Sequence, residues 1–220
     1  MAWPWLSLAP AGDGHPVLVI PGLLMGDTHT LPLRALLASR GHSAQGWGQG
    51  INFGHWDVLP AALEPLLDEL CARTARKASL VGWSIGGLFA RELARRRPDL
   101  VRMVVTLASG VAGSPHANHV WPLYERMTGH PAETLLVEPP PLPSTSIYSR
   151  GDGLANWRTC LQQPGPCWEN VEVFSNHHGL GMNPWAAYAV ADRLAQPEGG
   201  WKPFQPPAWG AAAYPRPHSP

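Results

Sequence analysis

The feature that most constrains this chain is the segment Gly82-Trp83-Ser84-Ile85-Gly86-Gly87, which joins a short apolar run to a helical pattern. The run 78–82 predicts a buried strand, and residues 88–97 have the spacing of a helix that ends at Pro98. A serine on a sharp strand-to-helix turn has a strained backbone, so glycine is needed two positions before and after it. The pattern predicts that Ser84 is raised out of the sheet edge. A glycine-rich turn that serves packing alone is the competing interpretation.

Strand and helix patterns alternate along the chain. Apolar runs between turn residues predict strands at 16–21, 43–47, 78–82, 101–107, 144–149 and 171–174. Apolar residues at helical spacing predict helices over 31–40, 59–76, 88–97, 120–127 and 185–194. This order predicts an α/β fold with a mostly parallel central sheet and helices on both of its faces. In such sheets functional residues lie at the carboxyl ends of the strands.

The length of 220 residues, 45% of them hydrophobic, predicts one domain with a single sizeable core. We assign that domain to residues 1–196. Within it, 113–143 is irregular and predicts a small cap or loop region. Residues 197–220 form a tail rich in Pro, Gly and Trp without periodicity, and we expect it to be extended or partly disordered.

Charge and motifs exclude several classes of partner and cofactor. The 16 basic and 16 acidic residues balance, which argues against nucleic acid or anionic lipid as a partner. The loop Gly46-Trp-Gly48-Gln-Gly50 has Phe53 where a dinucleotide-binding loop needs its third glycine. His116 and His119 have a metal-like spacing but no evident third ligand. We therefore expect no cofactor and no metal.

The cysteines and the hydropathy of the chain indicate its cellular compartment. Cys71, Cys160 and Cys167 are too few for a disulfide framework, and although 160 and 167 could pair, reduced thiols are the favoured interpretation. The N-terminal segment lacks the basic residues of a signal peptide, and no apolar stretch has the length of about 18 residues that crosses a bilayer. We expect a soluble, cytoplasmic protein without an integral membrane segment.

A serine hydroxyl becomes an effective nucleophile only when a neighbouring base takes its proton. In an α/β sheet with such a turn, the acid and then the histidine follow the serine. Asp152, flanked by Gly151 and Gly153 after a predicted strand, is the candidate acid, although an Asp-Gly turn with a local role is an alternative. His177 and His178 both follow the last predicted strand, and their spacing from Asp152 does not decide between them.

Two backbone amides are candidates for stabilising a developing oxyanion. The Ile85 N–H group lies at the predicted helix N-terminus, where the helix dipole is positive. The Leu23 N–H group follows the first predicted strand, and Gly22 permits the turn that would expose it. An ordinary Pro-Gly turn is the alternative for this second loop.

With these motifs in place, the chain from about Pro16 to Leu194 resembles the α/β-hydrolase superfamily, in particular compact bacterial esterase/lipase-like proteins. The resemblance rests on Val17-Leu-Val-Ile-Pro-Gly-Leu23, the Ser84 turn, Gly151-Asp-Gly153 and Asn176-His-His-Gly-Leu-Gly181. It implies that His177 is the base, because in the related motif the histidine stands two positions before a glycine. The chain departs from many relatives in having Pro-Gly in place of His-Gly at the oxyanion loop.

The resemblance and the motifs together predict a serine hydrolase that cleaves a small-molecule carboxylic ester through an acyl-enzyme on Ser84. The short cap implies an open, shallow acyl site, for which Leu23, Trp83 and Trp121 are candidate lining residues. Acyltransferase, thioesterase, perhydrolase and lactonase reactions use the same three side chains and stay open as alternatives. A non-catalytic hydrolase-fold protein that binds a ligand in the same pocket is the alternative from another class.

Overall fold

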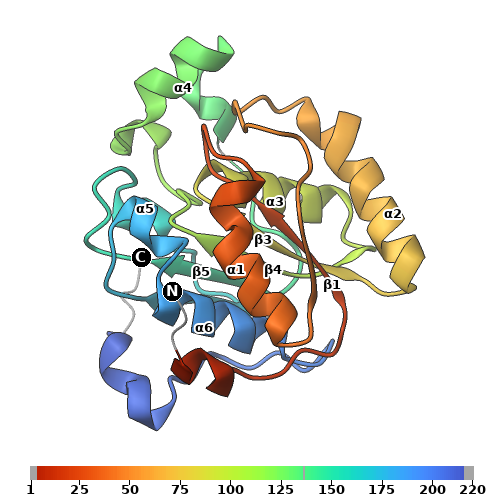
Figure 1. The fold of residues 1–220 in the computed structure, drawn as a ribbon. Helices are drawn as coiled ribbons and strands as arrows, with labels where there is room; N and C mark the ends of the chain where they lie inside the picture. Colours follow the sequence, from red (N-terminus) through yellow and green to blue (C-terminus); the bar gives the residue numbers. More distant parts are fainter. Residues whose placement is uncertain (1–3, 136, 216–220) are drawn as a thin grey trace.

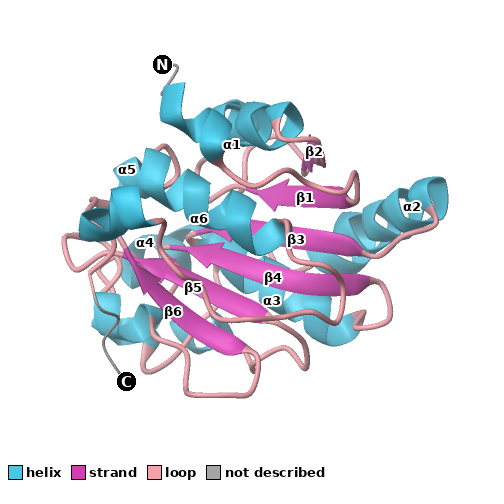
Figure 2. Cartoon of the chain, turned by 90° about the horizontal axis from the view of Figure 1, so that it is seen from below, coloured by secondary structure: helices cyan, strands magenta, loops and turns pink. Residues whose placement is uncertain are grey.

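The computed structural model describes residues 4–135 and 137–215. Its centre is a six-stranded sheet in the order β2-β1-β3-β4-β5-β6, and every neighbouring pair is parallel (Figures 1 and 2). The strands are β1 (Pro16–Ile20), β2 (Ser43–Gly46), β3 (Ala78–Trp83), β4 (Val101–Leu107), β5 (Ser144–Tyr148) and β6 (Trp168–Glu172). The predicted α/β fold with a parallel sheet is confirmed.

Helices cover both faces of this sheet, because alternate residues of the central strands are apolar on both sides. Val17 and Val19 of β1 pack in a core cluster with α1 (Asp27–Ser39) and α6 (Pro184–Leu194). Leu18 and Ile20 pack in the opposite cluster with α2 (Glu64–Thr74) and α3 (Ile85–Arg96). Because these neighbouring strands are parallel, the carboxyl ends of β1, β3, β4 and β5 lie along one edge of the sheet.

Several element boundaries differ from the sequence prediction, and two of them show the reason. Strand β6 spans 168–172 rather than 171–174, because its partner β5 pairs in register from Ser144 with Trp168 to Tyr148 with Glu172. Helix α1 begins at Asp27, before the apolar stripe starts, and the Asp27 carboxylate accepts hydrogen bonds from the Trp47 and Gly48 amides. Both boundaries depend on pairing with distant segments.

The expected cap region, 113–143, contains 3-10 helices at Pro115–Ala117 and Ala132–Leu135 and the helix α4 (Trp121–Thr128). In Figure 1 α4 stands clear of the sheet at one end of the molecule. Tyr124 fixes α4 to the core, since its hydroxyl contacts Trp56 Nε1 at 3.1 Å and Thr134 Oγ1 at 2.7 Å. Residue 136 of this region lies outside the described residues.

The tail differs from the expectation of an extended or partly disordered segment. Residues 208–213 form a 3-10 helix, and Tyr214 is buried with its hydroxyl donating to the Trp185 carbonyl at 2.7 Å. Trp185 also stacks on Trp5, with ring centroids 4.1 Å apart. Aromatic packing therefore orders the tail without a long regular element, while 216–220 lie outside the described residues.

Within the described part of the chain, no helix combines the length and the apolar character needed to cross a membrane.

Candidate active site

Ser84 lies on the turn between β3 and α3 in a backbone conformation that non-glycine residues rarely adopt, with φ 55° and ψ −125°. The flanking glycines allow this turn. A Cβ atom on Gly82 would lie 2.3 Å from the Gly86 carbonyl oxygen, and one on Gly86 would lie 2.4 Å from the Ile20 carbonyl oxygen. Gly82 therefore lets the turn close on itself, Gly86 lets it pack against the end of β1, and Ser84 lines the cavity above.

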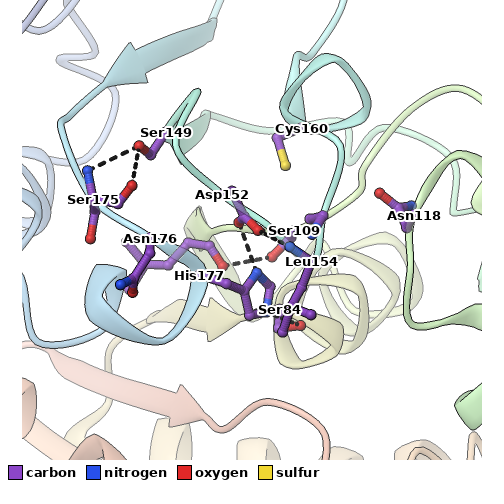
Figure 3. Close-up of polar contacts among 12 residues, drawn as sticks. Ser84, Ser109, Asn118, Ser149, Asp152, Leu154, Cys160, Ser175, Asn176 and His177 are labelled. Atoms are coloured by element: carbon purple, nitrogen blue, oxygen red, sulfur yellow. Dashed lines mark hydrogen bonds and ion pairs between the residues drawn. The ribbon is translucent and has the colours of Figure 1, made fainter.

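Ser84, His177 and Asp152 form a chain of hydrogen bonds (Figure 3). His177 Nε2 is 3.1 Å from Ser84 Oγ, and His177 Nδ1 is 2.7 Å from Asp152 Oδ2. A carboxylate only accepts, so Nδ1 carries a proton, and in the neutral ring Nε2 is free to accept the serine proton. The side chains of His177 and Asp152 are 6% and 1% exposed, so little water competes for these bonds.

The Asp152 carboxylate is held from both sides. Its Oδ1 atom accepts hydrogen bonds from the Leu154 amide at 2.9 Å and the Ala155 amide at 2.8 Å, which leaves Oδ2 for His177. A Cβ atom on Gly151 would lie 2.6 Å from the Ser175 carbonyl oxygen, so this flanking glycine lets the loop pass close to the segment before His177. The loop therefore orients the carboxylate toward the imidazole.

Of the two adjacent histidines, the structure brings His177 to the serine. His177 begins the short helix α5 (His177–Leu180), which Asn176 caps by accepting a hydrogen bond from the Gly179 amide at 2.7 Å. Trp83 Nε1 donates to the His177 carbonyl at 3.3 Å, and Gly181 packs against the same indole. His178 is exposed at the cavity, with its ring 5.7 Å from that of His177.

Both predicted oxyanion amides lie beside the serine. A Cβ atom on Gly22 would be 3.2 Å from Ser84 Cβ, so the loop after β1 packs directly on the turn. Among the hydrogen bonds of the described residues, neither the Leu23 nor the Ile85 amide has an acceptor, and both residues line the cavity. Asn52, which the sequence analysis did not single out, supports this loop by donating to the Pro21 carbonyl at 2.8 Å and accepting from the Leu24 amide at 2.7 Å through its backbone carbonyl.

A cavity of about 500 Å³ opens above Ser84, between the core and the cap. Its apolar lining comes from the loop after β1, from α3, from α4 and from the Asp152 loop, and includes Leu23, Met25, Leu88, Leu123, Tyr124, Leu135 and Leu154. Residues of the cap form one wall of this cavity. Leu23 lines it as expected. Trp83 and Trp121 do not: Trp83 is buried beneath α5, and Trp121 packs its ring against His116.

Other reactive groups near the site have different roles. Cys160 lies beside the Asp152 loop (Figure 3), and burial, followed by the charge of Asp152, raises the pKa of its thiol. It therefore stays protonated and is a poor nucleophile. His116 contacts Glu133 at 2.8 Å within the cap. Among the described residues, no group of three His, Cys, Asp or Glu side chains is arranged to hold a metal ion.

A second Ser-His-Asp set, which the sequence analysis missed, lies at the opposite end of β3. Ser79 Oγ is 2.8 Å from His15 Nε2, and His15 Nδ1 is 2.5 Å from Asp13 Oδ1. Ser79 and His15 are fully buried, and the serine has the ordinary conformation of a strand residue. No lining residue of the cavity above Ser84 belongs to this set.

Comparisons with known proteins bear on the fold and on partial sequence similarity. No protein-family model matches the chain. A pimeloyl-[acyl-carrier protein] methyl ester esterase of Shewanella woodyi is 30% identical over 118 residues, which cover 53% of this chain and 44% of that relative, so the match spans less than half of the relative's length. Among solved structures, a pyrethroid hydrolase PytH aligns with a TM-score of 0.62 at 18% identity over 83% of this chain and 98% of that one. A Paleococcus ferrophilus monoacylglycerol lipase aligns with a TM-score of 0.60 at 16% identity over 85% and 96%.

The sheet and these similarities define the fold. The chain has the α/β-hydrolase fold of these solved structures, and over about half of its length it is similar in sequence to a methyl ester esterase.

Proposed function

We propose that the protein is a serine hydrolase that cleaves carboxylic esters, with Ser84 as nucleophile, His177 as general base and Asp152 as the acid that orients the base. The observation that carries this proposal is the chain of hydrogen bonds from Asp152 through His177 to a strained serine that faces a cavity. The methyl ester esterase and monoacylglycerol lipase among the similar proteins support ester cleavage as the reaction.

In the proposed reaction, Ser84 Oγ attacks the ester carbonyl while its proton moves to His177 Nε2. The carbonyl oxygen becomes an oxyanion and accepts hydrogen bonds from the Leu23 and Ile85 amides. One such donor typically contributes about 3–4 kcal/mol to transition-state stabilisation. Protonated His177 then gives its proton to the leaving alcohol, and the acyl group stays on Ser84. Water attacks the acyl-enzyme with His177 again as base and releases the carboxylic acid.

The acyl-enzyme is common to esterases, acyltransferases, thioesterases, perhydrolases and lactonases, which differ in the donor or acceptor. A fluorophosphonate label tests the shared step: we expect the label on Ser84 in the wild type and no label in Ser84→Ala. A panel of acyl esters, thioesters and lactones, assayed with water, alcohols and peroxide as acceptors, then tests the ester reaction. Absence of the label from the wild type would contradict the serine hydrolase and favour a binding protein.

A further inference from the structure

The cavity above Ser84 has a mostly apolar lining with few polar side chains. Among the described residues that line it there is no Asp, Glu, Lys or Arg, and most of the surface is aliphatic. A charged group taken into such a lining would lose its hydration without gaining a partner, which costs several kcal/mol. The cavity therefore suits an uncharged substrate, whose orientation depends on the few polar side chains present.

Asn118, in the segment between the first 3-10 helix of the cap and α4, is one of these polar side chains. Its Oδ1 atom accepts a hydrogen bond from the Asn156 amide at 2.8 Å and a second one from Thr159 Oγ1 at 2.9 Å, which shares its single proton with the Asn156 carbonyl at 2.8 Å. A backbone N–H group can only donate, so the atom facing Asn156 must be the oxygen, and the orientation of the amide is determined.

The Nδ2 group of Asn118 is left as a donor. Among the described residues it has no acceptor, and it is not one of the unpaired polar atoms that are buried away from solvent. Asn118 is half-buried and lines the same cavity as Ser84. Figure 3 draws it to one side of the triad, beyond Leu154.

The other polar side chains of the lining are less suited to fix a substrate. Ser84 and His177 are engaged with one another. The imidazoles of His29, His119 and His178 are exposed, and His29 Nδ1 already accepts a hydrogen bond from the Gly26 amide at 3.2 Å. Asn118 differs from them because two hydrogen bonds hold it in place while its donor stays free.

We propose that Asn118 is a specificity-determining residue, and that the substrate is an uncharged ester carrying, besides the scissile group, one acceptor oxygen that receives the Asn118 Nδ2 hydrogen bond. This inference rests on the proposed ester hydrolysis. The remainder of the substrate is apolar and contacts the aliphatic walls. An unpaired donor facing a plain hydrocarbon substrate would lose its water without compensation, so the enzyme discriminates against that substrate.

The test compares a plain ester with analogues in which one methylene is replaced by an ether oxygen. One series of p-nitrophenyl alkanoates carries the oxygen at successive acyl positions, and a second series of hexanoates carries it in the alcohol. Each kcat/KM is divided by the rate of alkaline hydrolysis to remove intrinsic reactivity. We expect at least one ether ester to exceed its plain counterpart by about threefold to tenfold, the range of one neutral hydrogen bond.

Asn118→Asp separates the donor from the structural role. Its carboxylate can accept both hydrogen bonds from Asn156 and Thr159 but has no N–H group, so we expect the preference for the ether ester to disappear. Thr159→Val is the matched control, because it removes one bond to Oδ1 and keeps Nδ2, and it should retain the preference. Active-site titration with a fluorophosphonate corrects each variant for folded enzyme.

The outcomes are distinguishable. Absence of a preference from the wild type in both series, or a preference that survives in Asn118→Asp, would overturn the inference and leave ester hydrolysis intact. A carboxylate-terminated ester that is cleaved as fast as its neutral counterpart would also overturn it. Absence of hydrolysis of every ester together with absence of label on Ser84 would overturn the proposed function and the inference with it.

Discussion

The two ends of β3 carry the same three residue types in the same hydrogen-bonding order, Ser84-His177-Asp152 at the carboxyl end and Ser79-His15-Asp13 at the amino end. The serine–imidazole distances are similar, 3.1 Å and 2.8 Å. Their surroundings differ. Ser84 has a strained backbone, faces a cavity and lies beside two free amides, whereas Ser79 lies inside the strand among buried side chains.

The difference shows that a hydrogen-bonded Ser-His-Asp chain is not by itself a catalytic site. Attack on a carbonyl needs access for the substrate and donors for the oxyanion as well as a base. Only the carboxyl end of β3 presents these features among the described residues. At the amino end the buried Ser79 and His15 instead satisfy one another, and the partly exposed Asp13 carboxylate binds His15, Arg76 and Arg102.

The largest effect should come from replacing the two serines. Ser84→Ala removes the nucleophile and should lower kcat for ester hydrolysis by about 10⁵–10⁶-fold. Ser79→Ala removes only a buried hydrogen bond to His15, so it should keep kcat within about twofold and lower the free energy of unfolding by about 1 kcal/mol. Steady-state kinetics and urea unfolding measure both. Comparable losses of kcat in the two variants would refute the distinction.

The two aspartates should differ in the same way, by a smaller factor. Asp152→Asn removes the acceptor that keeps the proton on His177 Nδ1, so kcat should fall by about 10⁴-fold. Asp13→Asn should leave kcat nearly unchanged and lower stability by about 1–3 kcal/mol, since His15, Arg76 and Arg102 each lose a charged partner. An Asp152→Asn enzyme with near-wild-type kcat would show that the acid has no role in orienting the base.

Acid should destabilise the protein through the amino end of the sheet. Burial, followed by the charge of His15, lowers the pKa of His42 to about 4, and burial also lowers the pKa of His15. Charges of Arg40 and Arg102 lower the pKa of His42 further, while Asp13 opposes them. The unfolded chain therefore binds more protons than the folded one between about pH 6.5 and pH 4.

The contribution of neutral His42 to the free energy of unfolding is accordingly complete above pH 6.5. It falls by about 3 kcal/mol in total as the pH decreases toward 4. Urea unfolding at pH 7, 5.5 and 4.5 measures this loss. His42→Leu removes the titrating ring, whose two nitrogens have no partner in the structure, so the variant should lose less stability over the same range. Parallel losses in wild type and variant would assign the acid sensitivity to other groups.

The smallest effect is expected at His178, the neighbour of the proposed base. His178 is exposed and makes no hydrogen bond to Ser84 among the described contacts, so His178→Gln should change kcat by less than about threefold. His177→Gln should lower kcat by several orders of magnitude. Kinetics with one ester and one fluorophosphonate decide between them. A reversed order of the two effects would move the base to His178.

The sequence predicted the elements whose signal is local. The apolar runs at 16–21 and 101–107 correspond to β1 and β4, and the glycines around Ser84 specified the turn. Strand β6 begins at Trp168, where the alternation of apolar and polar residues is weak. Its start is therefore determined by pairing with β5. Helix α1 begins at Asp27 because that carboxylate binds amides 20 and 21 residues away.

In the site, too, local signals were predictable from the sequence and long-range contacts were not. The order of Ser84, Asp152 and His177 along the chain predicted which elements meet, and the structure brings these side chains together, while their roles in catalysis stay predictions. Spacing alone left His177 and His178 equal, because the choice depends on the Asn176 cap and on Trp83, 94 positions away. Asn118 had no local signal, since its partners lie 38 and 41 positions further on.

Trp83 links local unfolding of α5 to the loss of activity. The residue next to the nucleophile carries the indole that binds the carbonyl of the base and packs under Gly181 at the far end of α5. An opening fluctuation that carries the imidazole away must also break this bond and hydrate an indole that is only 4% exposed. The rate of amide hydrogen exchange in α5 should therefore report loss of activity directly. On heating, we expect activity to be lost when α5 unfolds cooperatively from the core.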